Sequence, residues 1–367
     1  MPLFFEPDDR GPYPHPGSYS HPGPGYDFHE RTVSRHLVHR AAVSEVLITG
    51  WQSTGPYDFL VGAQWPRAHG AHRLPGVRHH DPLLLAETVR QAGLLIGHVG
   101  FGVPRGHQFA LDELCYALGP DGVDGLAATG APACLMLEIG CHDVRIRNGR
   151  LASLRVQAEI RRDGRPVGRA AGQLRVYSPV AYARLRGDAR PAPVGPGHHG
   201  APWAPEPAVL DRGADAVLAP SPVPGSWLLR ADAGHPVLFD QAADHVPGML
   251  VLEAARQAAQ RLHREPVVPV ELVSSFNSLI ERDRPCLVRA VPEGGTVPPA
   301  RDGHGNGYED GHGYGSGRGR VPVRVVLVQD DRTVAECRVL TEPTGDAPAR
   351  SRADDRPGRT PGLPLAS

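Results

Sequence analysis

The chain contains no lysine, so all 39 of its basic residues are arginine. This absence excludes a Schiff-base lysine and a phosphate-loop lysine, and with them the enzyme classes that depend on either group. A GC-rich coding sequence favours arginine over lysine, and we interpret the bias as an effect of codon usage.

Cysteines and long apolar runs are also scarce. The five cysteines form no Cys-x-x-Cys pair, which is typical of reduced thiols in a cytoplasmic protein. The first residues lack the basic and apolar regions of a signal peptide. The apolar run Leu94–Ile96 is too short to cross a bilayer. We therefore expect a soluble, cytoplasmic protein that does not bind a membrane.

Several functional signatures are missing as well. The formal net charge is −1 and the arginines are scattered, so we expect no nucleic-acid partner. The sequence contains no Gly-x-Ser-x-Gly elbow, phosphate-binding loop or His-Glu-x-x-His motif. The glycines of Gly100–Gly106 have the wrong spacing for a dinucleotide site. We predict neither a cofactor nor a metal ion.

The 367 residues suggest two domains, and 44 Gly and 39 Pro predict irregular segments between them. We expect disorder over 1–30 and 344–367, a Pro-rich linker over 181–208, and a flexible Gly-rich insertion at about 293–320. We single out four residues of that insertion whose side chains could bind a metal ion. Ordering a flexible loop around an ion is entropically costly, so we interpret the insertion as a spacer. The four residues are His304, Glu309, Asp310 and His312.

The most informative feature is a motif, Glu-x-x-Arg-Gln-Ala, that occurs at 87–92 and again at 253–258. The copies are 166 residues apart (253 − 87), far longer than a solenoid repeat, which indicates a duplicated domain. Each copy lies in an apolar stretch that opens with proline. We predict helices over 82–98 and 247–263, with Asp81 as the N-cap of the first and Pro82 as its first residue.

The remaining apolar segments predict strands. The turns Asn148-Gly149 and Asp163-Gly164 predict tight hairpins. One helix followed by antiparallel strands is an α+β arrangement, and its repetition predicts a double hotdog fold with two adjacent helices and one joined sheet. The predicted strands are 43–48, 58–64, 108–118, 134–146, 151–160 and 168–177 in the first half, and 214–218, 226–231, 268–281, 286–292, 321–329 and 332–341 in the second.

The charged residues of the motif have two interpretations. Glu87 and Arg90 share one helix face among apolar neighbours, as do Glu253 and Arg256. A buried carboxylate needs a partner, so each pair is either a structural intrahelical ion pair or part of a functional site. Two copies on adjacent helices favour the second interpretation, in which a Glu from one helix and an Arg from the other line a shared pocket.

Each predicted helix is preceded by a loop that contains histidine. His69 precedes the first helix and His245 the second. A histidine beside a buried carboxylate is a plausible acid–base pair, so we include both residues among the site candidates.

At these residues the sequence resembles the A-factor biosynthesis (AfsA) family of actinobacteria. The similarity covers about 31–180 and 209–343, which we take as the two repeats. The matching segments are Val38–Arg40, Ala63–Arg67, Asp81–Leu84 with Glu87–Ala92, and His235–Asp240 with Asp244–Met249.

The resemblance implies both fold and reaction. It implies a double hotdog enzyme of γ-butyrolactone autoregulator biosynthesis. Such an enzyme moves a β-ketoacyl group from acyl carrier protein to the hydroxyl of dihydroxyacetone phosphate. For that chemistry we expect Glu87 as base or orienting group and Arg256 as phosphate or oxyanion partner. Glu253, Arg90, His69 and His245 are further candidates, and the apolar helix face would hold the acyl chain.

One position departs from the family pattern. The family usually has histidine where this chain has Gln241. The departure weakens a dehydratase mechanism and leaves open which of two pockets works. Two alternatives remain: a dehydratase or thioesterase acting on carrier-protein thioesters, and a non-catalytic regulatory paralogue that binds acyl ligands.

Overall fold

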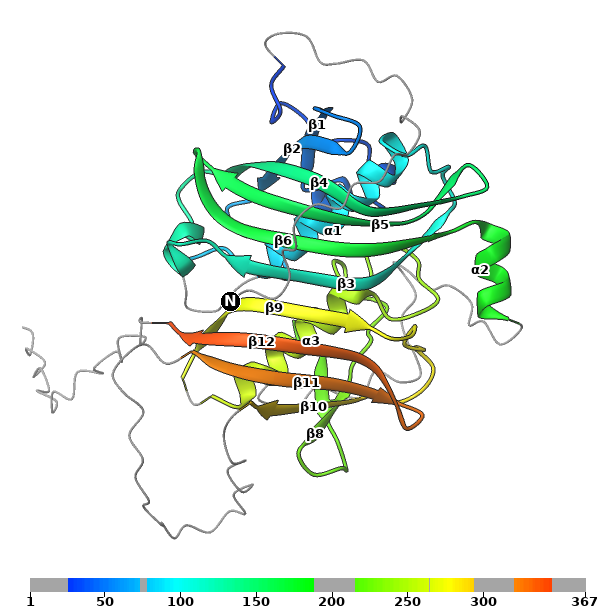
Figure 1. Ribbon diagram of the computed structural model, residues 1–367. Coiled ribbons are helices and arrows are strands. Elements are labelled where there is room, and N and C mark those ends of the chain that lie inside the picture. Colours follow the sequence, from blue (N-terminus) through cyan, green and yellow to red (C-terminus); the bar gives the residue numbers. More distant parts are fainter. Residues whose placement is uncertain (1–25, 73–77, 188–214, 264, 294–319, 345–367) are drawn as a thin grey trace, which may run out of the picture.

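The computed structural model describes residues 26–72, 78–187, 215–263, 265–293 and 320–344 (Figure 1). Residues 1–25, 188–214, 294–319 and 345–367 lie outside these ranges, and with them most of the predicted N-terminal disorder, linker, Gly-rich insertion and C-terminal tail. The four candidate metal-binding residues of the insertion also lie outside the described ranges. The first residues of the predicted linker, 181–186, are described and belong to a helix, so the linker prediction was wrong there.

The first half contains six strands and two helices. Short 3₁₀ turns occur at Arg35–Leu37, Val43–Glu45 and Gly122–Leu126. The elements in chain order are β1 (Ile48–Ser53), β2 (Asp58–Trp65), α1 (Leu83–Val99), β3 (Gln108–Leu118), β4 (Ala133–Arg147), β5 (Arg150–Arg162), β6 (Arg165–Tyr177) and α2 (Pro179–Arg186).

The second half repeats this order with shorter elements and no counterpart of α2 among the described residues. It consists of β7 (Leu218–Pro220), β8 (Ser226–Leu229), α3 (Gly248–Arg261), β9 (Val267–Phe276), β10 (Leu287–Pro292), β11 (Val321–Gln329) and β12 (Arg332–Pro343).

The twelve strands of the described residues form one antiparallel sheet, in the order β1-β2-β4-β5-β6-β3-β9-β12-β11-β10-β8-β7. The two halves of this order mirror each other about the β3–β9 pair, where Cys115 lies opposite Val273. Two side chains bond across this seam: Tyr116 Oη donates to Pro269 O (3.2 Å) and Ser274 Oγ to Leu114 O (2.6 Å). The seam therefore joins the halves by backbone and side-chain bonds.

The two long helices lie side by side on the same face of this sheet (Figure 1). Fifteen of the seventeen residues of α1 are buried, including Glu87, because the sheet of its own half and the second half enclose it. This is the double hotdog arrangement predicted from the repeated motif.

Most predicted elements are confirmed to within a few residues. The first long helix begins at Leu83 with Pro82 at the N-cap position, one residue later than predicted. Asp81 Oδ1 still accepts the Leu83 N–H (2.9 Å) at this end of the helix. Both hairpin turns have the expected positive φ, for example 50° at Asn148 and 71° at Gly149. The φ values are possible because asparagine and glycine tolerate this backbone conformation.

The predicted strands 43–48 and 214–218 were largely wrong. In the first, the Glu45 carbonyl and the Leu47 N–H are satisfied by the Gln91 side chain rather than by a neighbouring strand. In the second, Gln257 bonds Asp215 and Val217 in the same way. The predicted strand 268–281 also ends early, since β9 stops at Phe276.

Candidate active site

The repeated motif builds the same hydrogen-bond network in each half. Glu87 accepts hydrogen bonds from Arg90 Nε (2.8 Å) and Gln91 Nε2 (2.6 Å). Glu253 accepts them from Arg256 Nε (2.8 Å) and Gln257 Nε2 (2.6 Å). The glutamine of each copy then ties its helix to the segment that leads into the first strand of its half. The network that both copies share therefore has a structural role in each half.

The loop histidine His69 also has a structural counterpart. His69 Nδ1 accepts the backbone N–H groups of Ala71 and His72 (3.3 and 3.2 Å). His235, 166 residues later (235 − 69), accepts those of Val237 and Leu238 (3.2 and 3.0 Å). Each histidine thus fixes the turn before its helix. The features that differ between the halves are the better indicators of a site.

Arg40 is the first such difference. It pairs with Glu87, which is 2% exposed, and its Nη1 donates to Val237 O (3.1 Å) in the second half. Its Nε is buried and has no hydrogen-bond partner among the described residues. The Asp240 carboxylate lies 4.0 Å from Nη1 and accepts the N–H groups of Ala41 and Ala42 (2.7 and 2.9 Å). Arg40 therefore lies between the halves, and its Nε–H is a donor that no described residue uses.

These contacts determine the ionisation state of Glu87. Burial alone would raise the pKa of its carboxyl group. The charges of Arg40 and Arg90 and their hydrogen bonds outweigh burial and hold the pKa well below its usual range. Glu87 is thus an ionised carboxylate whose oxygens already accept three side chains, which makes it a poor proton acceptor.

A cavity of about 710 Å³ opens between the halves next to Arg40 and Arg90. This volume is in the range of small-molecule sites. Its wall combines His39 and Arg40, parts of α1, β3 and β6, the end of α2, the loop 237–247, the start of α3 and the segment 276–281.

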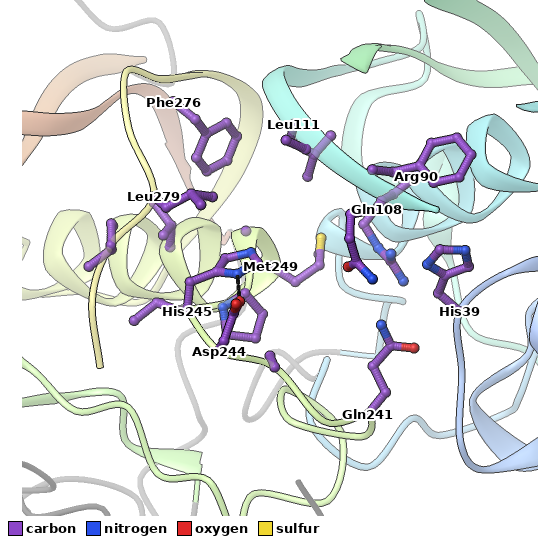
Figure 2. Close-up of a pocket in the computed structure, with 18 of the residues that line it drawn as sticks. His39, Arg90, Gln108, Leu111, Gln241, Asp244, His245, Met249, Phe276 and Leu279 are labelled. Carbon is purple, nitrogen blue, oxygen red and sulfur yellow. Dashed lines mark hydrogen bonds and ion pairs between the residues drawn. The ribbon is translucent and has the colours of Figure 1, made fainter. Parts of the chain in front are cut away.

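The cavity has an apolar side and a polar side (Figure 2). Phe276 and Leu279 lie beside His245, with Leu111 across from Phe276. Arg90 and Gln108 lie on the opposite side, together with His39. Gln241 points toward this polar group from below.

His245 and Asp244 form a dyad on this wall. His245 Nδ1 lies 2.7 Å from Asp244 Oδ1. Burial would raise the pKa of Asp244, but hydrogen bonds from His245 and Tyr182 and the charges of His245 and Arg186 lower it well below its usual range. Because an ionised carboxylate only accepts, Nδ1 carries the proton and Nε2 is left as the free acceptor of the ring.

A second pair, His39 and His98, also has a defined tautomer. His98 Nδ1 must donate to the carbonyl of Val103 (2.7 Å), because a carbonyl only accepts. His98 Nε2 therefore accepts from His39 Nε2 (2.9 Å), and His39 Nδ1 is unprotonated. Burial, together with nearby His98 and Arg90, lowers the pKa of His39 to about 3. His39 is neutral at physiological pH and offers an acceptor.

The structure separates the six predicted site residues into two groups. Arg90 and His245 line the cavity, and Glu87 lies directly behind Arg90 and Arg40. Glu253, Arg256 and His69 are buried but are not among the lining residues.

The predicted pairing of Glu87 with Arg256 does not occur among the described residues. Arg256 bonds Glu253 on its own helix, and its Nε lies 3.9 Å from Asp81 Oδ2. The predicted Glu87–Arg256 pairing failed because residues three apart on a helix are neighbours. Each arginine therefore bonds the carboxylate one turn earlier on its own helix, and this contact costs less side-chain entropy than a contact with the other helix.

Sequence reasoning assigned no role to several cavity residues. His39, Arg40 and Asp240 lie in the segments that carry the family resemblance, which is the signal that marks them. Arg186 lines the cavity and Tyr182 bonds Asp244 without lining it; both residues lie on α2, a helix that was not predicted. The pair Ser178-Pro179 was the available signal, since serine is a favoured N-cap and proline a favoured first helical residue.

The described residues contain no group of three or more His, Cys, Asp or Glu side chains arranged to hold a metal ion. None of their helices has the length and apolarity needed to span a membrane.

Comparison with known proteins gives a consistent result. Residues 26–178 and 217–271 match the A-factor biosynthesis hotdog domain, AfsA. A Streptomyces virginiae protein called 2-oxo-3-(phosphooxy)propyl 3-oxoalkanoate synthase is 40% identical over 317 residues, covering 84% of this chain and 97% of that protein. A Streptomyces griseus protein with the same description is 37% identical over 285 residues, covering 77% and 93%.

Among solved structures, the 12:0-ACP thioesterase from Umbellularia californica is similar with a TM-score of 0.43 and 9% identity. The similarity covers 78% of this chain and 94% of that one.

Proposed function

The chain belongs to the A-factor biosynthesis (AfsA) family, and on this basis we propose that it catalyses the reaction for which its relatives are named. It is an acyltransferase of γ-butyrolactone autoregulator biosynthesis. It transfers a β-ketoacyl group from acyl carrier protein to the hydroxyl of dihydroxyacetone phosphate, giving a 2-oxo-3-(phosphooxy)propyl 3-oxoalkanoate ester.

One observation carries the assignment to this cavity. The His245–Asp244 dyad lies between an apolar side, which suits the acyl chain, and an arginine-containing side, which suits the phosphate. The thioester and the hydroxyl must meet where these two parts of the substrates join. The position of His245 fits this meeting point.

The reaction follows from the tautomer of His245. Nε2 accepts the proton of the dihydroxyacetone phosphate hydroxyl while its oxygen attacks the thioester carbonyl. The tetrahedral intermediate then collapses, the carbon–sulfur bond breaks, and the leaving thiolate takes the proton back from Nε2. The products are the ester and the free carrier thiol, and Asp244 stabilises the transient imidazolium.

The phosphate is held by the guanidinium groups on the polar side. Arg90 lines the cavity and shares the Glu87 carboxylate with Arg40, whose Nε–H has no hydrogen-bond partner within the described part of the chain. Guanidinium groups suit phosphate because their planar donors can bind two oxygens at once. The sequence predicted that Glu87 is either the base or an orienting group. In this proposal Glu87 is the orienting group, and His245 is the base.

The departure at Gln241 fits the same arrangement. Gln241 lines the cavity but cannot accept a proton as a histidine would. The dyad and His39 supply the imidazole groups on either side of it. The transfer proposed here therefore uses no histidine at position 241, whereas a dehydratase mechanism would.

The test uses purified protein with a β-ketoacyl carrier protein and dihydroxyacetone phosphate. We expect a phosphorylated ester by mass spectrometry and an equal amount of free carrier thiol. His245→Asn should lower kcat by about 10²–10⁴-fold, the usual contribution of a general base. His36→Asn removes an exposed histidine and serves as the matched control.

Other outcomes distinguish the alternatives. Release of free acid or enoyl thioester would indicate a thioesterase or a dehydratase. Ligand-dependent stabilisation without turnover would indicate a non-catalytic acyl-binding protein. Unchanged kcat in His245→Asn would remove His245 from the mechanism even if the ester forms.

A further inference from the structure

Helix α2 belongs to the first half but contacts the loop of the second half that carries the dyad. Ser178 Oγ accepts the Ala181 N–H (3.2 Å) and begins the helix. Tyr182 is 3% exposed, and its hydroxyl donates to Asp244 Oδ1 (2.8 Å) and lies 3.3 Å from His245 Nδ1. The side chain therefore lies against both members of the dyad.

Arg186, one turn later, holds the other side of the same carboxylate. Its Nε lies 3.4 Å from Asp244 Oδ2, and Nη2 donates to the Asp244 carbonyl (3.2 Å). The guanidinium is itself fixed by a bidentate bond to Glu281, with distances of 2.6 and 2.8 Å. A bidentate pair of this kind restricts the guanidinium to one orientation.

We propose that Tyr182 and Arg186 are positioning residues that orient the Asp244 carboxylate and, through it, the imidazole of His245. In this arrangement a helix of the first half fixes the base carried by the second half. The inference rests on the proposed function, since it assumes that His245 is the base. Neither residue needs to touch the substrate.

The charges around the dyad set the direction of the expected effects. His245, together with Tyr182 and Arg186 of α2, acts directly on Asp244. From the segment after β9, Glu281 pairs with Arg186, and Arg282 is within reach of the Asp244 charge. Removing a donor or a cation from Asp244 leaves its negative charge less compensated. The imidazolium form of His245, which pairs with this carboxylate, is then stabilised relative to the neutral ring.

The experiment compares Tyr182→Phe, Arg186→Gln and Arg186→Lys with the wild type and with Arg184→Gln, an exposed residue of the same helix. In Tyr182→Phe and Arg186→Gln we expect kcat to fall roughly 10–100-fold, with the KM for dihydroxyacetone phosphate within about twofold. The acid limb of the kcat/KM profile should move to higher pH by about 0.5–1. Arg186→Lys should recover part of the loss.

A merely structural role predicts something different. Partial unfolding would lower kcat and the amount of folded protein together and leave the acid limb in place. Folded variants with an unchanged kcat and an unchanged limb would overturn the proposal.

A second measurement does not require turnover. The His245 Nδ1 proton should give a downfield NMR resonance that shifts in Tyr182→Phe and Arg186→Gln and disappears in Asp244→Asn. A resonance that is the same in wild type, Tyr182→Phe and Arg186→Gln would overturn the positioning role. If wild type transferred no acyl group but the resonance shifted as expected, the proposed function would fail while the positioning role remained.

Discussion

Glu87 and Glu253 occupy equivalent positions in the two halves, and their charges are balanced differently. Each accepts hydrogen bonds from an arginine and a glutamine of its own helix. Glu87 gains Arg40 as a third partner, and this arginine connects it to the cavity. In the second half Arg256 instead lies near Asp81 of the first half. The two copies of the motif thus have different charged neighbours, Arg40 beside the first copy and Asp81 beside the second.

The ionisation of the buried Asp81 carboxyl group should make the stability of the protein depend on pH. Asp81 is fully buried, its Oδ1 accepts the Leu83 N–H at the start of α1, and its Oδ2 has no hydrogen-bond partner among the described residues. Burial is the largest cause of the rise in its pKa from 3.8 to about 6. A raised carboxyl pKa means that ionisation costs folding free energy. The cost is absent below about pH 4, grows between pH 4 and 6, and is complete above pH 6.

Asp81→Asn should therefore stabilise the protein more at pH 8 than at pH 4.5. Asparagine keeps an oxygen that can accept the Leu83 N–H but cannot ionise. The difference between the two pH values should be about 2–3 kcal/mol, the free energy that corresponds to the raised pKa. Urea denaturation at both pH values measures it, with the exposed Asp283→Asn as control. An equal effect of Asp81→Asn at both pH values would contradict the prediction.

Among the elements, the start of α3 limits the apolar side of the cavity. A Cβ at Gly248 would lie 2.9 Å from Leu111 Cδ1 and 3.4 Å from Phe276 Cζ. Glycine at this position therefore lets the start of α3 pack closely against these two side chains, which line the apolar side of the cavity. An added methyl group would force Leu111 to shift.

Gly248→Ala should change which acyl chains are accepted. We expect kcat/KM to fall about tenfold for a long-chain β-ketoacyl thioester, because inserting a methyl group into a packed site costs roughly 1–3 kcal/mol. The value for a four-carbon chain should hardly change. Gly130→Ala, where a Cβ would meet nothing within 4 Å, is the matched control. Equal losses for both chain lengths would show that Gly248 does not limit the acyl side.

Elements also show where local sequence information fails. The periodicity of the two long helices and the turn residues of the hairpins predicted these elements well, because local chemistry determines them. The segments 43–48 and 214–218 looked like strands because apolar residues predominate in them. Their backbones instead bond Gln91 and Gln257, which are distant in sequence.

At the scale of the whole molecule, the β3–β9 seam should make the two halves unfold together. The seam carries the Tyr116–Pro269 and Ser274–Leu114 hydrogen bonds, and the buried residues of both halves form one continuous core. We expect a single calorimetric transition with equal calorimetric and van't Hoff enthalpies. Two resolved transitions would contradict this coupling.

Tyr116→Phe tests the seam itself. The change leaves the Pro269 carbonyl without its side-chain donor and should cost about 1–2 kcal/mol. For a protein of this size the midpoint should fall by roughly 2–4 °C without the transition splitting. A midpoint within error of wild type would show that the bond contributes little to the coupling.

The sequence by itself determined the duplication, the two central helices, most of the strands and the family, because periodicity, turn residues and motif spacing are local properties. It also identified Arg90 and His245 as candidates. Only the tertiary structure decided that Glu87 pairs with Arg40 rather than with Arg256, and that α2 meets Asp244. Arg40 and Glu87 lie 47 residues apart along the chain, and Ala41 and Asp240 lie 199 apart. Because such partners are distant in sequence, only the packing of the two halves brings them together.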